Sequence, residues 1–190
     1  MSSEFKIVLA STSPRRMELM RQIFDDFIIV EPKFQETLNH IDPSKRAIIN
    51  AEAKTLSVAC AFPDSVIIGA DTIVYLDGLF LGKPNNPDTA RDMLGKLSGK
   101  MHLVYTGVAV FDSSTGILVS GFEETKVFFK NLSSVQIEKY VDSGKPLDKA
   151  GAYGIQDEGG LFIDRIIGTY SNVMGLPLDL LRDLLRSFII

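Results

Sequence analysis

The stretch KIVLASTSPRR at residues 6–16 decides how the fold begins. Its apolar half, residues 6–10, predicts a short buried strand. Apolar side chains over residues 15–24 recur at the spacing of one helix face, and Ser13 and Pro14 suit the N-cap and first helical positions. The segment therefore predicts a strand, a tight loop and a helix.

The rest of the chain repeats this interleaving of strands and helices. Helix-start signals occur at residues 42–43 (Asp-Pro), at residues 86–87 (Asn-Pro) and at Ser133–Gln136, which has the form of a capping box. A last apolar-rich helix is expected over residues 176–190, and residues 77–78 (Asp-Gly) predict a hairpin turn. Further strands are expected at residues 66–70, 73–76, 103–111, 117–121 and 125–129. This order favours one mixed α/β domain, with helices packed on a twisted sheet and room for two lobes around a cleft.

Composition limits the classes of protein that the chain can represent. It has 190 residues, 45% of them hydrophobic, with 20 Lys+Arg against 24 Asp+Glu and a formal net charge of −4. A hydrophobic content this high argues against disorder, and an acidic chain argues against a nucleic-acid polymer as partner. Cys60 is the only cysteine, so neither an intramolecular disulfide nor a cysteine-based zinc cage can form. The first ten residues lack the pattern of a secretory signal, and no apolar run approaches the roughly 20 residues that span a bilayer. We therefore expect a cytoplasmic protein that does not enter a membrane.

The first candidate site is the loop at residues 11–16. A strand-to-helix loop presents backbone N–H groups and the positive end of a helix dipole, which together bind anions. Ser11, Arg15 and Arg16 add hydroxyl and guanidinium donors with the geometry that phosphate prefers. An ordinary helix cap followed by solvated arginines is the alternative.

The second candidate is Asp71, which directly follows the apolar run at residues 66–70. We expect it at the carboxyl end of a buried strand, where open α/β sheets bind their ligands. A carboxylate there can hold Mg²⁺ or orient a water for attack on phosphorus. An aspartate that only starts a turn is the alternative.

Two further segments carry weaker signals. Lys83 lies in a Gly-Lys-Pro turn that can contact phosphate, although the glycine spacing and the proline rule out a P-loop. Gln156 ends a glycine-rich segment, and its amide can pair with the edge of a base. A surface turn and a loop without ligand are the respective alternatives. Asp157 and Glu158 are expected to be solvated surface residues.

Taken together, six short motifs resemble the Maf family of nucleoside triphosphate pyrophosphatases, over about residues 6–182. The motifs are Ser-x-Ser-x-Arg-Arg at 11–16, Gly-Ala-Asp-Thr at 69–72, Gly-Lys-Pro at 82–84, Tyr-Thr-Gly at 105–107, Asp-Lys-Ala-Gly-Ala-Tyr-Gly-Ile-Gln at 148–156 and Gly-Leu-Pro at 175–177. The resemblance implies an elongated mixed sheet flanked by helices, with a central cleft, similar to the inosine triphosphatase fold. It also implies metal-dependent hydrolysis, by Mg²⁺ or Mn²⁺, between the α and β phosphates of a nucleotide. Homodimers are common in this family.

The resemblance also implies roles for individual residues. Asp71 matches the metal ligand or general base, Glu36 approximately matches a second metal ligand, and Gln156 matches the residue near the base. Gln35 departs from the family pattern, in which an acidic residue often precedes that glutamate. The remaining matches are Ser11, Arg15 and Arg16 in the phosphate-binding loop and Lys54 and Lys83 as the two cleft lysines.

The resemblance further implies a substrate class. Arg15, Thr72 and Gln156 match the branch that acts on dTTP, UTP and modified pyrimidine nucleotides, and differ from the branch that acts on 7-methyl-GTP. Two alternatives are an inosine-type triphosphate pyrophosphatase and a nucleotide-binding regulator of cell division, at septum formation, that needs no catalysis.

Overall fold

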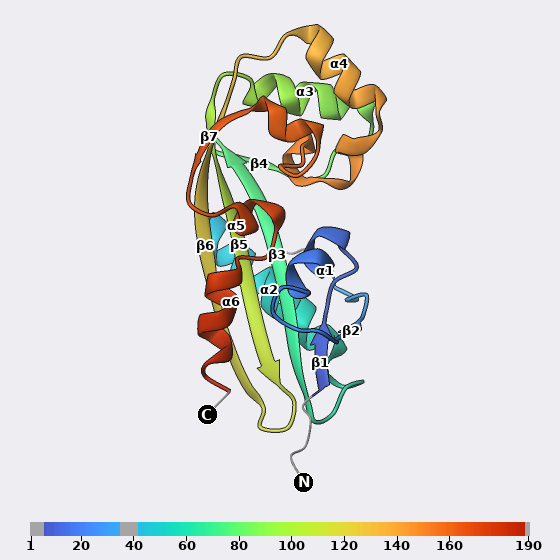
Figure 1. Cartoon of the computed structure of the whole chain (residues 1–190), viewed down its shortest axis with the longest axis vertical. Helices are drawn as coiled ribbons and strands as arrows, with labels where there is room; N and C mark the ends of the chain where they lie inside the picture. Colours follow the sequence, from blue (N-terminus) through green and yellow to red (C-terminus); the bar gives the residue numbers. More distant parts are fainter. Residues whose placement is uncertain (1–5, 35–41, 189–190) are drawn as a thin grey trace. The chain divides into compact units, whose positions relative to one another are not determined.

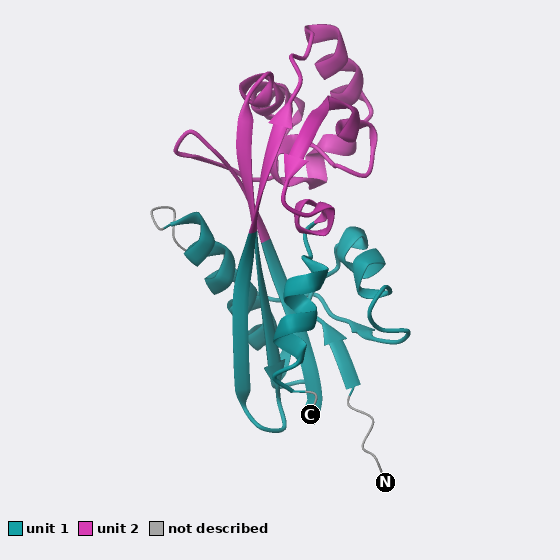
Figure 2. Cartoon of the chain, turned by 60° about the vertical axis from the view of Figure 1, so that its left-hand side comes forward, with its two compact units in different colours: residues 1–71, 106–123, 175–190 teal, residues 72–105, 124–174 magenta. Residues whose placement is uncertain are grey.

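A computed structural model describes residues 6–34 and 42–188 of the chain (Figure 1). The chain divides into two compact units, which differ in colour in Figure 2. Unit 1 comprises Met1–Asp71, Thr106–Glu123 and Gly175–Ile190, and unit 2 comprises Thr72–Tyr105 and Glu124–Met174.

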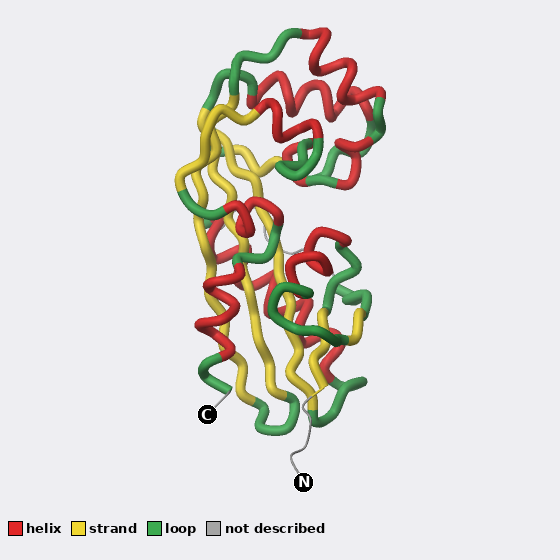
Figure 3. Tube along the Cα trace, viewed as in Figure 1, coloured by secondary structure: helices red, strands yellow, loops and turns green. Residues whose placement is uncertain are grey.

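The secondary structure is a mixed sheet with helices packed on it (Figure 3). The strands are β1 (Lys6–Leu9), β2 (Ile28–Ile29), β3 (Ser65–Leu76), β4 (Leu79–Leu81), β5 (Met101–Asp112), β6 (Ile117–Phe129) and β7 (Ile163–Ile167). Their order is β2-β1-β3-β5-β6-β7, with β4 paired to β3. β1 runs parallel to β2 and β3, whereas the β3–β4 and β6–β7 pairs are antiparallel. The expected mixed α/β class is confirmed, and the expected central cleft stays a prediction.

Helices account for most of the remaining residues. The α-helices are α1 (Pro14–Met20), α2 (Pro43–Ala59), α3 (Pro87–Leu97), α4 (Ser134–Asp142), α5 (Tyr170–Met174) and α6 (Leu178–Leu185), and the 3-10 helices are η1 (Lys145–Asp148), η2 (Ala150–Ala152) and η3 (Glu158–Phe162). None of the helices in the described ranges is both long and apolar enough to cross a membrane.

In unit 1, α2 covers one face of the strands and α6 covers the other (Figure 1). α2 approaches the sheet closely at two glycines. A Cβ at Gly69 would lie 2.3 Å from the Thr55 hydroxyl, and one at Gly107 would lie 2.2 Å from the Ala47 carbonyl oxygen. Since real Cβ atoms do not approach that closely, only glycine at these two positions allows α2 to pack this close to the sheet. On the other face, α6 buries Leu178, Leu181 and Leu185.

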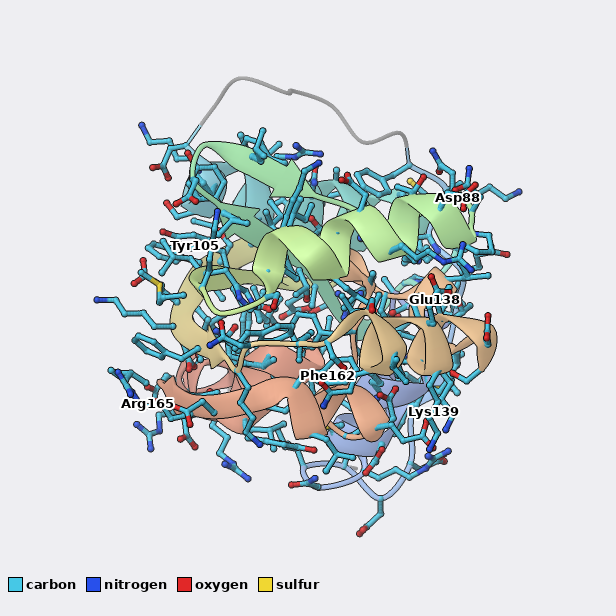
Figure 4. The ribbon with its side chains drawn as sticks, turned by 90° about the horizontal axis from the view of Figure 1, so that it is seen from above. Asp88, Tyr105, Glu138, Lys139, Phe162 and Arg165 are labelled. Carbon is cyan, nitrogen blue, oxygen red and sulfur yellow. The ribbon has the colours of Figure 1, made fainter. Side chains whose placement is uncertain are left out.

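Unit 2 has its own apolar core. α3 and α4 lie side by side, and Figure 4 shows Asp88 at the start of α3 and Glu138 on the side of α4 toward α3. Arg91 bridges them, with contacts of 2.8 Å to both carboxylates. Below the helices, Phe162 packs edge-to-face on Tyr140 of α4, with ring centroids 5.1 Å apart.

Local sequence signals predicted the helix starts correctly. Asp42 accepts hydrogen bonds from two backbone N–H groups of α2, and Asn86 accepts one from Thr89 at the start of α3. Ser133 and Gln136 form the expected capping box. Ser13 is the N-cap of α1, but its side chain makes no capping hydrogen bond.

Strand and helix lengths differ from the sequence predictions. The two strands expected at residues 66–76 are one continuous strand, β3, and the two expected at residues 117–129 are β6. Polar residues inside these strands were interpreted as breaks, but the sheet ladder continues through them. The last helix ends at Leu185, which makes it shorter than expected. The Asp-Gly hairpin turn is confirmed, with φ of +47° at Asp77 and +88° at Gly78.

Candidate active site

A carboxylate on β3 and two side chains on α2 form the centre of the candidate site in unit 1. Asp71 is only 6% exposed, and its carboxylate accepts a hydrogen bond from Asn50 Nδ2 at 2.9 Å. Lys54 Nζ donates to the other carboxylate oxygen. Asn50 and Lys54 are four residues apart, so they lie on one face of α2. Both oxygens of Asp71 are therefore held by donors from a single helix.

The strand period explains why this cluster forms. Alternate residues of a strand point to the same face, so Asp71 faces the same way as Gly69. Gly69 allows the close approach of α2 at Thr55, and this approach lets Lys54, one residue earlier, and Asn50, five residues earlier, reach the carboxylate. The glycine and the aspartate of the Gly-Ala-Asp motif thus have linked roles.

The position of Asp71 corrects one sequence prediction. Asp71 was expected directly after a strand, but it lies within β3, which continues to Leu76. The strand is buried almost throughout, so a polar residue inside it looked like an end. The side chain is tolerated there because Asn50 and Lys54 satisfy its oxygens.

The loop between β1 and α1 adds hydroxyl and guanidinium groups to unit 1. Ala10 N donates to Ile68 O at 2.8 Å, so the loop starts beside the part of β3 that precedes Asp71. Ser11 is buried, and its hydroxyl accepts hydrogen bonds from Arg16 Nη1 and from the Ser13 amide, each at 3.3 Å. Ser11 therefore lies in the loop, as expected, whereas Arg15 and Arg16 lie in the first turn of α1.

Arg16 connects this loop to the C-terminal part of the chain. Its Nε donates to the Gly175 carbonyl at 2.8 Å, within the Gly-Leu-Pro motif. Burial lowers the pKa of Arg16, the negative charge of Asp71 opposes that shift, and the positive charge of Arg15 adds to it. Arg16 thus lies within electrostatic range of both Asp71 and Arg15.

Sequence reasoning missed two side chains at this cluster. Asn50 is 1% exposed, and its Oδ1 is buried without a hydrogen-bond partner among the described residues. The Phe34 ring lies under the Lys54 ammonium, 4.9 Å from the ring centroid. A polar residue four positions before Lys54, on the helix face that also carries Ala47 and Ala51, was the available signal for Asn50.

The donor set is compatible with a magnesium ion that arrives with its substrate. Across residues 6–34 and 42–188, no three His, Cys, Asp or Glu side chains lie close enough together to cage a metal. Mg²⁺ in phosphate-binding sites is typically held by one or two carboxylates together with substrate phosphates. Asp71 supplies one such carboxylate, and Asn50 Oδ1 supplies a second oxygen without a partner. Glu36, the other expected ligand, lies outside the described residues.

Unit 2 holds the other two expected site residues. Lys83 and Gln156 are both exposed. Gly151 N donates to Gly82 O at 3.1 Å, so the Gly-Lys-Pro turn is tied to the segment that leads to Gln156. These two motifs are therefore neighbours within the unit.

Asp157 is not a solvated surface residue, contrary to the sequence prediction. Its carboxylate accepts hydrogen bonds from the Tyr140 hydroxyl and from Gly159 N, each at 2.8 Å. Glu158 is exposed as expected and pairs with Lys145 at 2.9 Å. Nothing in the sequence indicated this role, because the partner of Asp157 is Tyr140, which lies 17 residues earlier in the chain.

Comparison with known proteins identifies relatives that align with nearly the whole chain and share one name. A protein from Moorella thermoacetica is 46% identical over 184 residues, which cover 96% of this chain and 95% of that protein. Proteins from Carboxydothermus hydrogenoformans and Desulforamulus reducens are 44% and 45% identical over 183 residues, which cover 96% of this chain and 98% and 96% of those proteins. All three are named dTTP/UTP pyrophosphatase. The family profile described as Maf-like protein matches residues 6–188, and the chain therefore belongs to the Maf-like protein family.

Proposed function

We propose that this protein hydrolyses nucleoside triphosphates, with dTTP and UTP as its substrates, to the monophosphate and pyrophosphate. The observation that carries the proposal is the buried Asp71 carboxylate, held by Asn50 and Lys54 in electrostatic range of Arg16. The names of relatives that are 44–46% identical along the whole chain support the same activity.

The charges of the cluster suit a polyphosphate. A triphosphate brings about four negative charges, and catalysis of phosphoryl transfer depends mainly on positioning and charge stabilisation. In this proposal Ser11, Arg15 and Arg16 bind phosphate oxygens, and Asp71 orients the attacking water. Lys54 fixes the direction of that carboxylate through its hydrogen bond. Lys83 and Gln156 are proposed to contact the phosphates and the base, respectively.

We further propose that a divalent metal, Mg²⁺ or Mn²⁺, acts as the cofactor. Asp71 would hold it, together with Glu36 and the substrate phosphates. When bound, such an ion neutralises phosphate charge and lowers the pKa of a coordinated water.

A nucleotide panel with Mg²⁺ or Mn²⁺ tests the proposed substrate class. We expect dTTP and UTP to give the highest kcat/KM, and 7-methyl-GTP, ITP and dGTP to be much poorer substrates. Pyrophosphate release is the signal to measure. A clear preference for 7-methyl-GTP or ITP would contradict the substrate assignment, and binding of dTTP without turnover would favour the non-catalytic regulator of cell division.

We also propose a cytoplasmic location, no nucleic-acid polymer as partner and a homodimeric state. The acidic composition, with a net charge of −4, supports the second point. Light scattering after size exclusion measures the oligomeric state, and a monomer mass of 20.9 kDa would contradict the dimer.

A further inference from the structure

We propose that Tyr140 is a positioning residue that clamps the loop carrying Gln156, and so sets how tightly the base of the nucleotide is bound. The inference rests on the proposed function, because it assigns a cause to the base contact of Gln156. It concerns only unit 2, in which Tyr140, its partners and Gln156 all lie.

The Tyr140 hydroxyl holds the loop on both sides of Gln156. It accepts a hydrogen bond from Gly154 N at 3.2 Å and donates one to Asp157 Oδ1 at 2.8 Å. Gln156 lies between these two anchor points in sequence, and its own side chain is exposed. A single hydroxyl therefore fixes the backbone before the glutamine and the side chain after it.

A buried lysine completes the clamp. Lys149 is 8% exposed, and its ammonium lies 3.4 Å from Asp157 Oδ2. The same ammonium donates to the Lys145 carbonyl at 2.6 Å and to Asp148 Oδ1 at 2.7 Å. Asp157 is thus held through one oxygen by Tyr140 and Gly159 N and through the other by Lys149.

The loop is in close contact with the clamp. A Cβ at Gly159 would lie 2.8 Å from the Tyr140 hydroxyl oxygen, and one at Gly154 would lie 2.5 Å from Asp157 Oδ2. The backbone lies so close to the Tyr140 hydroxyl at Gly159, and to the Asp157 carboxylate at Gly154, that only glycine fits at these two positions.

Tyr140 itself is firmly anchored. It is 3% exposed on α4, and its ring packs edge-to-face on Phe162. Burial and the hydrogen bond to Asp157 raise its pKa above the ordinary value, so the hydroxyl keeps the proton that it donates. Fixing a loop in its binding conformation in advance removes an ordering cost from each binding event.

The variant Tyr140→Phe tests the inference, because it removes the hydroxyl and keeps the ring on Phe162. We expect the KM for dTTP to rise about tenfold, since the loop that carries Gln156 must then be ordered when the nucleotide binds, at a cost of roughly 1.4 kcal/mol. We expect kcat to change less than twofold. Inhibition by inorganic tripolyphosphate, which has no base, should keep the Ki of the parent protein.

Tyr153→Phe is the matched control. It also removes a buried tyrosine hydroxyl from unit 2, but that hydroxyl pairs with His102 Nε2 on β5, at 2.7 Å. We expect a similar loss of stability and an unchanged KM. All assays are run well below the unfolding temperature of both variants.

Three results would overturn the inference. They are an unchanged KM in Tyr140→Phe, an equal rise in the tripolyphosphate Ki, and an equal rise in KM in Tyr153→Phe. If the parent protein binds dTTP with Mg²⁺ but does not hydrolyse it, the proposed function fails, and calorimetric Kd values for the same variants then decide on the clamp. A tenfold weaker Kd in Tyr140→Phe alone would support it.

Discussion

At the scale of single residues, Asp71 shows how a charged group is accommodated in a buried strand. Taking a carboxylate out of water is costly unless hydrogen bonds and opposite charge compensate it. Asn50 and Lys54 supply that compensation from α2, and Arg16 adds a positive charge from the first turn of α1. The same groups leave the carboxylate oriented, which a catalytic or metal-binding role requires.

Replacing Asp71 with Asn tests this role directly. We expect kcat to fall by about 10³-fold, because the amide cannot act as base or bind the metal as a carboxylate does. Calorimetry should still detect binding of dTTP, since the arginines are unchanged.

Asp112→Asn is the control for this variant. Asp112 is an equally buried carboxylate of unit 1, and it accepts hydrogen bonds from Ser114 and Thr115 at the end of β5. This control should lose some stability and keep its turnover. An Asp71→Asn variant with more than a tenth of the parent kcat would remove Asp71 from catalysis.

His102 on β5 gives a prediction about pH. It is buried against Phe129 and Tyr153, and this burial lowers its pKa to about 3. In the unfolded chain its pKa is about 6.5, so the folded state gains stability from the neutral ring above that pH. This contribution is lost as the pH falls from about 6.5 toward 3.

The variant His102→Gln cannot titrate at this position, so its stability should depend less on pH. Between pH 7 and pH 5 we expect the parent to lose about 2 kcal/mol more free energy of unfolding than the variant. Urea denaturation at the two pH values measures the difference. Equal losses in the two proteins would show that His102 is not a buried neutral ring.

At the scale of elements, the contact between α2 and the sheet controls the site. Gly69→Ala would place a methyl group against Thr55 and push α2 outward, at a cost of about 1–3 kcal/mol in stability. Asn50 and Lys54 would move with the helix, so we expect kcat to fall as well. Thermal unfolding and dTTP turnover report the two effects.

Gly95→Ala is a control for which we expect the opposite change in stability. Gly95 lies inside α3, and a Cβ there would meet nothing within 4 Å. Alanine should therefore stabilise the helix by about 0.5–1 kcal/mol without a change in turnover. If Gly69→Ala were as stable and active as the parent, the close approach of α2 would not matter for the site.

Elements with local signals were predictable from the sequence, and those that depend on distant contacts were not. The caps at Asp42, Asn86 and Ser133 are hydrogen bonds within a few residues, so the chain at each cap contains its own signal. β2 is only two residues long and exists through its pairing with β1, which no local pattern shows.

The candidate site follows the same rule. Asp71 was a candidate from its place after an apolar run, Lys54 came from the resemblance to a family, and the structure brings them together. The roles of Asn50 and Asp157 depend on contacts 21 and 17 residues away, and only Asn50 had a signal in the sequence, its helical spacing from Lys54. Asp71 and Thr72 in the middle of β3 were also interpreted as the end of a strand. Because β3 is buried on both faces, its sequence lacks the alternation of apolar and polar residues that would have shown it to be continuous.

At the scale of the whole molecule, the chain has a net charge of −4, yet its unit 1 places Lys54 and Arg16 near one carboxylate, with Arg15 near Arg16. An acidic protein with a local group of cations is suited to small anions more than to a nucleic-acid polymer. This distribution of charge agrees with a nucleotide that arrives with its metal ion.

The most direct test of the account is product analysis of dTTP with Mg²⁺ by ³¹P NMR. We expect dTMP and pyrophosphate in equal amounts from the parent protein, and about 10³-fold slower formation of both from Asp71→Asn. Release of dTDP and inorganic phosphate, or no reaction of dTTP in the parent protein, would contradict it.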